Sequence, residues 1–360
     1  MTTSEIQSLA GQLFVVGFPA TTPTQAVVSA AAAGALGGVI LFKRNIASDL
    51  IDVARLNADL AGAAGGHEPL LIAVDQEGGR VARIGPPAMK LPPMISLEAS
   101  DDAFVEALAA AQSRQLRALG FTMNFAPVLD VHSNESNPII GDRAFSRDAT
   151  RAASRALAFA KGMRAGGLLS CGKHFPGHGD TSQDSHLDLP TVAHDRARLD
   201  DVELAPFRAA APSGVDALMT AHVVYPALCS QPATLSRRIA TELLRGELGF
   251  TGVLFSDDLE MKALSATMSY GQSAVRAIEA GCDALLVCSQ EAAWHEAREA
   301  VAERASRDGA FRARCEEAKA RFVAMRRRCA PTPITDAAQL SAHFGTDEQT
   351  ALQARAWVAR

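Results

Sequence analysis

The chain has 360 residues, of which 48% are hydrophobic and 21% charged, so it can bury a large core as one barrel-sized domain or as two ordinary ones. Its formal net charge of −5 leaves no basic field for nucleic acid or anionic lipid. The composition therefore excludes a nucleic-acid-binding or membrane-surface protein and favours a small substrate without strong charge.

The beginning of the chain, Met-Thr-Thr-Ser-Glu-Ile-Gln, lacks the cationic segment of a secretion signal. The apolar run at residues 13–18 is too short for a signal peptide or a membrane span, so we expect a cytoplasmic protein. The six cysteines form no Cys-x-x-Cys pair. We expect them to be reduced and mostly buried, without disulfides or a structural zinc.

Short apolar runs recur along the chain and alternate with Ala-, Glu- and Arg-rich stretches of helical periodicity. Continuous apolar strands that alternate with amphipathic helices predict a parallel sheet covered by helices. Eight such units are the number that closes a (β/α)8 TIM barrel, the fold we predict. The first run could instead lie across the bottom of the barrel. The runs are residues 13–18, 38–42, 70–74, 121–126, 168–171, 217–221, 252–255 and 284–288, and the clearest helical stretches are 102–119, 148–166, 199–211 and 273–280.

The sequence after residue 288 does not resemble a second folding unit. It is charged and helical from 291 to 328, is broken by Ala-Pro-Thr-Pro at 330–333, and ends in a helix-like piece at 347–360. We therefore predict a single domain, with the barrel in residues 1–330 and a C-terminal extension in residues 331–360 that packs on it.

A dense group of titratable side chains follows the run at 168–171. Residues 173–186, Lys-His-Phe-Pro-Gly-His-Gly-Asp-Thr-Ser-Gln-Asp-Ser-His, contain one lysine, three histidines and two aspartates. We expect the strand to end near Gly172, and the proline and glycines prevent a regular helix beyond it. Titratable groups on a loop that a rigid strand holds in place indicate a reaction site.

Two other interpretations of this loop are weaker. A polar Gly-rich loop can be a plain surface connection, but the density of proton-transferring groups argues against it here. His174 and His178 are four residues apart, which is a metal-binding spacing only in a helix. Pro176 and Gly177 prevent that helix, and the zincin glutamate is missing, so we predict no metal.

Polar residues also follow other predicted strands, at the barrel end where chemistry is expected. They are Asp-Gln-Glu-Gly-Gly-Arg at 75–80 with Arg83 behind it, Asp130 with the loop through Gly-Asp-Arg at 141–143, His222, and Ser-Asp-Asp-Leu-Glu at 256–260. Each of these residues could instead have a purely structural role. Arg80 or Arg143 could form a structural ion pair or be solvated, and His222 could be a hydrogen-bonded core histidine. Asp257 or Asp258 could cap the next helix.

Glycosidic bond cleavage requires a nucleophile and a proton donor. A carboxylate after the run at 252–255 would supply the first, and the acid-base loop after the run at 168–171 would supply the second. Together with Val-Asp-Gln-Glu-Gly-Gly-Arg-Val at 74–81 and Phe-Ser-Asp-Asp-Leu-x-Met at 255–261, the loop at 173–186 resembles the bacterial β-N-acetylglucosaminidases of glycoside hydrolase family three. The resemblance runs in order from about residue 12 to residue 289.

The resemblance implies a role for each matching position. Asp257 would attack the anomeric carbon, and His186 would be the general acid/base, paired with Asp184. The residues implied to bind the hydroxyls of the terminal N-acetylglucosamine are Asp75, Arg83, Arg143, Lys173 and His174. Members of this branch are single-domain retaining enzymes that use neither a metal nor an organic cofactor.

The implied activity is that of a retaining exo-β-N-acetylglucosaminidase that forms a glycosyl-aspartate intermediate. With no export signal in view, the expected substrates are peptidoglycan fragments, N-acetylglucosamine linked β-1,4 to anhydro-N-acetylmuramic acid with or without peptide. We expect no obligate protein partner. Four alternatives remain, namely a phosphorylase or a β-glucosidase of the same fold, a Schiff-base lyase that uses Lys173, and a non-catalytic sugar-binding protein.

Overall fold

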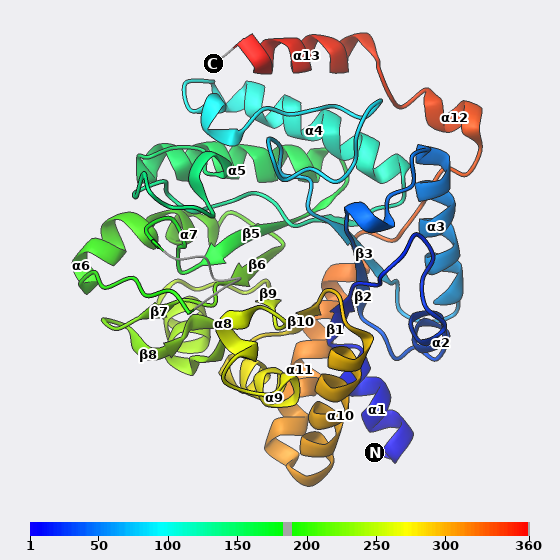
Figure 1. Cartoon of the computed structure of the whole chain (residues 1–360), viewed down its shortest axis with the longest axis vertical. Helices are drawn as coiled ribbons and strands as arrows, with labels where there is room; N and C mark the ends of the chain where they lie inside the picture. The colour runs from blue at the N-terminus through cyan, green and yellow to red at the C-terminus, as the bar shows by residue number, and fades with distance from the viewer. Residues whose placement is uncertain (183–188, 359–360) are drawn as a thin grey trace.

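A closed barrel of parallel strands forms the centre of the molecule (Figure 1). The structure, a computed structural model, describes residues 1–182 and 189–358. Within them eight strands close in the order β1-β10-β9-β6-β5-β4-β3-β2. Their bounds are β1 Phe14–Val16, β2 Gly38–Leu41, β3 Leu71–Val74, β4 Met123–Asn124, β5 Leu169–Phe175, β6 Ala217–Thr220, β9 Val253–Asp258 and β10 Ala284–Val287. Because β1 pairs with both β2 and β10, the first apolar run is a barrel strand, and the predicted (β/α)8 fold is confirmed.

Helices cover the outside of the barrel. Several begin at a Thr, Asp or Ser side chain that accepts a first-turn N–H, as at Asp101 and Asp148. Glycines with positive φ follow α4 and α5 before the next strand, at Gly120 and Gly167. The helices are α1 Thr3–Gly11, α2 Gln25–Ala32, α3 Leu50–Ala63, α4 Asp102–Ala118, α5 Ala149–Ala165, α6 Arg196–Arg198, α7 Ala205–Ala210, α8 Lys262–Ser265, α9 Tyr270–Ala280, α10 Glu291–Arg307, α11 Gly309–Arg326, α12 Ala337–Ser341 and α13 Asp347–Val358.

Shorter pieces complete the chain. A two-stranded antiparallel hairpin, β7 Val224–Tyr225 and β8 Cys229–Pro232, follows β6. Single 3-10 turns lie at Lys43–Asn45, Met94–Leu97, Gly141–Arg143 and Ala233–Leu235, and wider π-helical pieces lie at Leu199–Glu203 and Arg238–Glu247. In the described part of the chain, no helix combines the length and the apolar character needed to cross a membrane.

The N-terminal end of the barrel is filled by α11. Phe322 packs edge-on against Phe255, whose ring meets Phe125 inside the barrel, with centroids 5.6 Å and 5.3 Å apart. The buried Arg326 donates to the carbonyl oxygens of Gly37 at 2.7 Å and Pro69 at 3.1 Å, just ahead of β2 and β3. With this end closed, a substrate has access only from the C-terminal ends of the strands.

Strand β5 is longer than the sequence suggested. We predicted that it ends near Gly172, and this was wrong, because it continues to Phe175. The backbone beyond Gly172 finds partners on both sides, with Leu129 N–H donating to the Lys173 carbonyl at 2.6 Å and Ala221 N–H donating to the Phe175 carbonyl at 2.8 Å. Lys173 and His174 are therefore fixed by the sheet and buried, rather than carried on a loop.

Candidate active site

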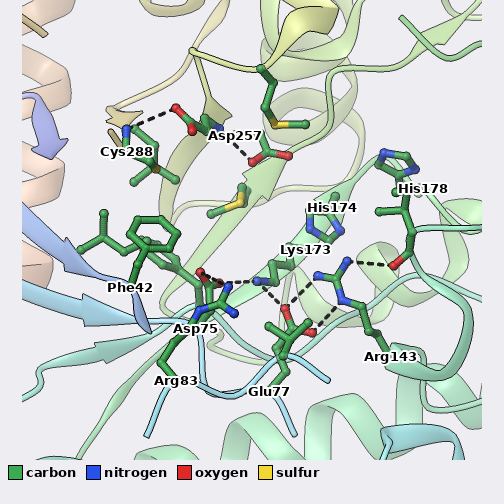
Figure 2. A pocket seen from close by; sticks show the side chains of 18 residues that line it. Phe42, Asp75, Glu77, Arg83, Arg143, Lys173, His174, His178, Asp257 and Cys288 are labelled. Atoms are coloured by element: carbon green, nitrogen blue, oxygen red, sulfur yellow. Dashed lines mark hydrogen bonds and ion pairs between the residues drawn. The ribbon is translucent and has the colours of Figure 1, made fainter. Parts of the chain in front are cut away.

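A small pocket opens at the C-terminal ends of the barrel strands (Figure 2). Its volume is about 220 Å³, below the roughly 300–1,000 Å³ of pockets that hold drug-sized ligands. Six of the eight residues to which the resemblance assigns a role line it, namely Asp75, Arg83, Arg143, Lys173, His174 and Asp257. The other two, Asp184 and His186, lie outside the described residues.

Alternating charges form one wall of the pocket. Lys173 Nζ lies 2.8 Å from Asp75 Oδ1 and 2.7 Å from Glu77 Oε1. Arg143 forms a two-pronged pair with Glu77, its Nε and Nη2 each 2.8 Å from a carboxylate oxygen. Arg83 Nη2 lies 3.6 Å from Asp75 Oδ2 at the outer edge. We call these five residues the charged wall (Figure 2).

Within the wall, neighbouring charges keep Glu77 and Lys173 ionised. Burial favours the neutral form of Glu77, but Arg143 and Lys173 outweigh it and hold the pKa of that carboxyl well below its usual range. Burial likewise opposes the charge on Lys173, but Asp75 and Glu77 raise the pKa of the ammonium above its ordinary value. A Schiff-base nucleophile must be a neutral amine, so this environment disfavours the lyase alternative.

His174 is held by a buried carboxylate behind it. Its Nδ1 lies 2.7 Å from Asp130 Oδ2, and Asp130 Oδ1 accepts the backbone N–H groups of His174 at 3.1 Å and His178 at 2.7 Å. Burial alone would raise the pKa of Asp130, but the histidines and these N–H groups lower it. The carboxylate therefore orients the ring by Nδ1, while the side chain lines the pocket.

His178 reaches the pocket as a neutral group. Its Nδ1 lies 2.8 Å from Thr181 Oγ1, and burial, reinforced by the neighbouring His174, lowers the pKa of His178 to about 4. Asn137 donates to the carbonyl oxygens of His178 at 2.9 Å and Gly179 at 3.1 Å, which fixes the chain here.

Among the described residues, no group of three or more acidic, histidine or cysteine side chains is arranged to hold a metal ion.

Two adjacent carboxylates lie at the end of β9. Asp257 lines the pocket, and its Oδ1 accepts the N–H of Asp258 at 2.8 Å. Asp258 Oδ1 accepts the N–H groups of Glu260 at 3.1 Å and Cys288 at 3.3 Å. We had considered that one of the two aspartates caps the next helix. Neither does, because α8 starts after Met261 without a side-chain cap. Asp258 instead ties the end of β9 to the end of β10.

Asp258 should make the stability of the protein depend on pH. Burial, then the negative charges of Glu260 and Asp257, raises its pKa from 3.8 to about 7. Between these values the folded state keeps a proton that the unfolded state releases, so this group's contribution to stability falls as the pH rises through that window. Asp258→Asn keeps the acceptor oxygen and removes the charge.

We therefore expect Asp258→Asn to have a higher Tm than the unaltered protein near pH 8, and the difference to vanish near pH 4. Thermal unfolding at the two pH values measures this difference in Tm. The control is Asp59→Asn, because Asp59 is an exposed carboxylate on α3. A difference in Tm that is equal at both pH values would contradict the assignment.

Other predicted positions have structural roles. Arg80 is half-exposed, pairs with Asp142 at 3.2 Å and donates to the Ile139 carbonyl at 2.6 Å, so it holds the loop after β4. His222 is buried, with Nδ1 2.7 Å from Thr234 Oγ1 and Nε2 2.9 Å from the Asp258 carbonyl oxygen. It is the hydrogen-bonded core histidine that we weighed against a site residue.

Some lining residues were not singled out as candidates. Glu77 is buried in the charged wall, although the segment that contains it was recognised. Phe42, at the end of β2, contributes an apolar face, with the Arg83 guanidinium 5.7 Å from its ring centroid. The position of Glu77 two residues after Asp75 was a usable signal, whereas nothing in the sequence marked Phe42.

Comparisons with known proteins identify the family of this chain. Residues 6–323 match the model of the glycosyl hydrolase family 3 N terminal domain. A β-hexosaminidase from Chromobacterium violaceum is 42% identical over 262 residues, which cover 71% of this chain and 72% of that protein.

Solved structures give the same result. A glycoside hydrolase family 3 β-N-acetylglucosaminidase from Paenibacillus sp. str. FPU-7 has a TM-score of 0.91 at 39% identity, over 98% of this chain and 68% of that one. NagZ from Neisseria gonorrhoeae in complex with N-trifluoroacetyl-D-glucosamine has a TM-score of 0.76 at 31% identity, over 96% and 97% of the two chains. The family match spans most of the barrel, and the chain therefore belongs to glycosyl hydrolase family 3.

Proposed function

We propose that this β-N-acetylhexosaminidase of glycosyl hydrolase family 3 releases terminal β-linked N-acetylglucosamine with net retention, and that Asp257 is its nucleophile. The observation that carries the proposal is the position of Asp257 at the end of β9, in the same small pocket as the charged wall. One carboxylate reaches the pocket from a rigid strand, and a set of sugar-binding groups lies with it.

In the proposed reaction, Asp257 attacks the anomeric carbon while an acid protonates the leaving oxygen. The glycosyl-aspartate ester is then hydrolysed by a water molecule, which the residue that acted as the acid now activates as a base. We assign the acid/base role to His186 and the support of its imidazole to Asp184, on the family resemblance. A histidine with an ordinary pKa of about 6.5 can perform both proton transfers near neutral pH.

The charged wall is proposed to hold the sugar hydroxyls. Asp75 can accept hydrogen bonds from vicinal hydroxyls, and Lys173 and Arg83 can donate to them, in charge-assisted contacts stronger than neutral ones. Arg143 donates hydrogen bonds from Nε and Nη2 to Glu77, and from Nη1 to the Ile139 carbonyl at 3.2 Å. This leaves two of the five guanidinium protons for a ligand. His174 completes the set.

We further propose that the substrates are peptidoglycan fragments in which N-acetylglucosamine is β-1,4-linked to anhydro-N-acetylmuramic acid, with or without peptide. The small pocket suits a single terminal sugar, which supports exo action. The Neisseria gonorrhoeae neighbour is described with an N-acylated glucosamine, which supports an N-acetylglucosamine residue in the corresponding pocket here.

One assay tests the activity and its stereochemistry. The protein is incubated with an aryl N-acetyl-β-glucosaminide and, separately, with an aryl β-glucoside, and the first anomer released is followed by NMR. We expect cleavage of the N-acetylated substrate with the β-anomer appearing first. Release of the α-anomer first would contradict the double-displacement mechanism, preference for the glucoside would favour the β-glucosidase alternative, and a rate that requires phosphate would favour the phosphorylase.

A further inference from the structure

The C-terminal helix α13 is attached to the segment that follows β3. Gln353 Oε1 accepts the backbone N–H of Lys90 at 2.6 Å, and Trp357 Nε1 donates to the Lys90 carbonyl at 2.8 Å. The Lys90 ammonium also lies 5.5 Å from the centroid of the Trp357 ring. One residue of the β3 to α4 connection, Lys90, is thus held at both its N–H and its C=O by a helix more than 260 positions away in sequence.

A second, buried link joins the same two regions. Gln115 on α4 donates to Gln349 Oε1 on α13 at 2.8 Å, and its own Oε1 accepts the N–H of Met89 at 2.8 Å. Both glutamine side chains are almost fully buried. The helix therefore contacts the connection directly at Lys90 and through Gln115 at Met89, while α13 itself lies along α4 (Figure 1).

The held segment runs directly to the charged wall. The carbonyl of Leu91, next to Lys90, accepts the N–H of Gly79 at 3.0 Å. Gly79 has φ +52°, and a Cβ there would lie 2.9 Å from Pro93 Cα, so a side chain at this position would be strained. The turn after β3 that contains Gly79 also presents Glu77 to Lys173 and Arg143.

The other end of the segment is closed by a buried glutamine. Gln76 Oε1 accepts the N–H groups of Arg83 at 2.7 Å and Ile84 at 2.9 Å, and its Nε2 donates to the Ile84 carbonyl at 3.1 Å. Residues 76–91 therefore form one hydrogen-bonded unit. Its inner side carries Glu77 and Arg83 into the pocket, and its outer side is bonded to α13.

We propose that α13 is a positioning element of the substrate pocket, acting through Gln353, Trp357 and the Gln115 link to keep residues 76–91 in place. The family match ends at residue 323, so this helix lies beyond the matched region. The inference rests on the proposed function, because it takes Arg83 and the charged wall to be sugar-binding groups. Asp257 stands on β9 and has no part in this attachment, so loosening α13 affects substrate binding more than the chemical step.

The test compares matched substitutions on the same helix. In the double variant Gln353→Ala, Trp357→Ala, we expect KM for an aryl N-acetyl-β-glucosaminide to rise by about five- to tenfold while kcat stays within about twofold. Gln353→Glu, which keeps an acceptor oxygen for the Lys90 N–H, should have nearly the original KM. Glu348→Ala is the control, because it removes an exposed ion pair between α13 and Arg114 and leaves the attachment at Lys90 intact.

A second readout does not require activity. Hydrogen exchange at residues 76–91 should accelerate in the double variant and remain unchanged in Glu348→Ala. The inference is overturned if the folded double variant keeps the original KM and exchange rates, or if the control raises KM equally. Failure of the proposed function would look different, since the unaltered protein would then not cleave the N-acetylated substrate at all.

Discussion

Asp257→Ala is expected to lower kcat/KM for an aryl N-acetyl-β-glucosaminide by about 10⁴-fold or more. Without the carboxylate, no glycosyl-enzyme can form, and the oxocarbenium-like transition state loses the negative charge beneath it. The pocket and the charged wall remain, so the variant should still bind the sugar. Steady-state release of the aryl alcohol measures the effect.

Two controls make this result specific. Asp142→Ala removes another carboxylate of the same barrel end that pairs with Arg80 and does not line the pocket, and it should keep nearly full activity. Added azide should restore part of the turnover of Asp257→Ala, because the small anion can occupy the vacated space, and the product should be the α-glycosyl azide. Normal turnover by Asp257→Ala would overturn the mechanism.

Glu77→Ala is expected to cost both stability and substrate binding. It removes the carboxylate that lies between Lys173 and Arg143, so Arg143 loses its two-pronged partner and Lys173 keeps only Asp75. Removing one partner of a buried ion pair typically costs about 3–5 kcal/mol, and urea unfolding measures this loss. KM should rise as well, since the two cations lose their fixed positions.

Glu77→Gln separates the charge of this residue from its hydrogen bonds. The amide oxygen can still accept from Lys173 and Arg143, but the negative charge is lost. We expect an intermediate loss of stability, with a KM closer to that of the unaltered protein. If Glu77→Ala had the stability and KM of the unaltered protein, the charged wall would have no role in holding the pocket together.

The sequence predicted the barrel because each strand is an apolar run that can be recognised from its own residues, without knowledge of its contacts. It also placed Asp75 and Asp257 correctly at strand ends, where residues far apart in sequence converge, but it put Lys173 on a loop, whereas β5 includes this residue. The burial of Glu77 could not be predicted in the same way. Its two-pronged partner Arg143 lies 66 positions later, and a glutamate in a Gly-rich turn is ordinarily solvated.

Two further features depend on contacts that no local pattern reveals. β5 passes its predicted end because the segment after β4 and the end of β6 supply backbone partners for Lys173 and Phe175. The attachment of α13 at Lys90 depends on two side-chain hydrogen bonds across more than 260 positions. Helical periodicity predicted the helix itself but gave no indication of what it holds.

Trapping the covalent intermediate tests the central claim most directly. In a 5-fluoro analogue of N-acetyl-β-glucosaminyl fluoride, the ring fluorine slows both steps by destabilising their oxocarbenium-like transition states. The good fluoride leaving group keeps formation of the glycosyl-enzyme faster than its hydrolysis, so the intermediate should accumulate. After proteolysis, mass spectrometry should find one fluorinated N-acetylglucosaminyl group, attached through the side chain of Asp257. Continued consumption of the analogue with no labelled peptide, or a label on Lys173 instead, would contradict a glycosyl-aspartate mechanism at this site.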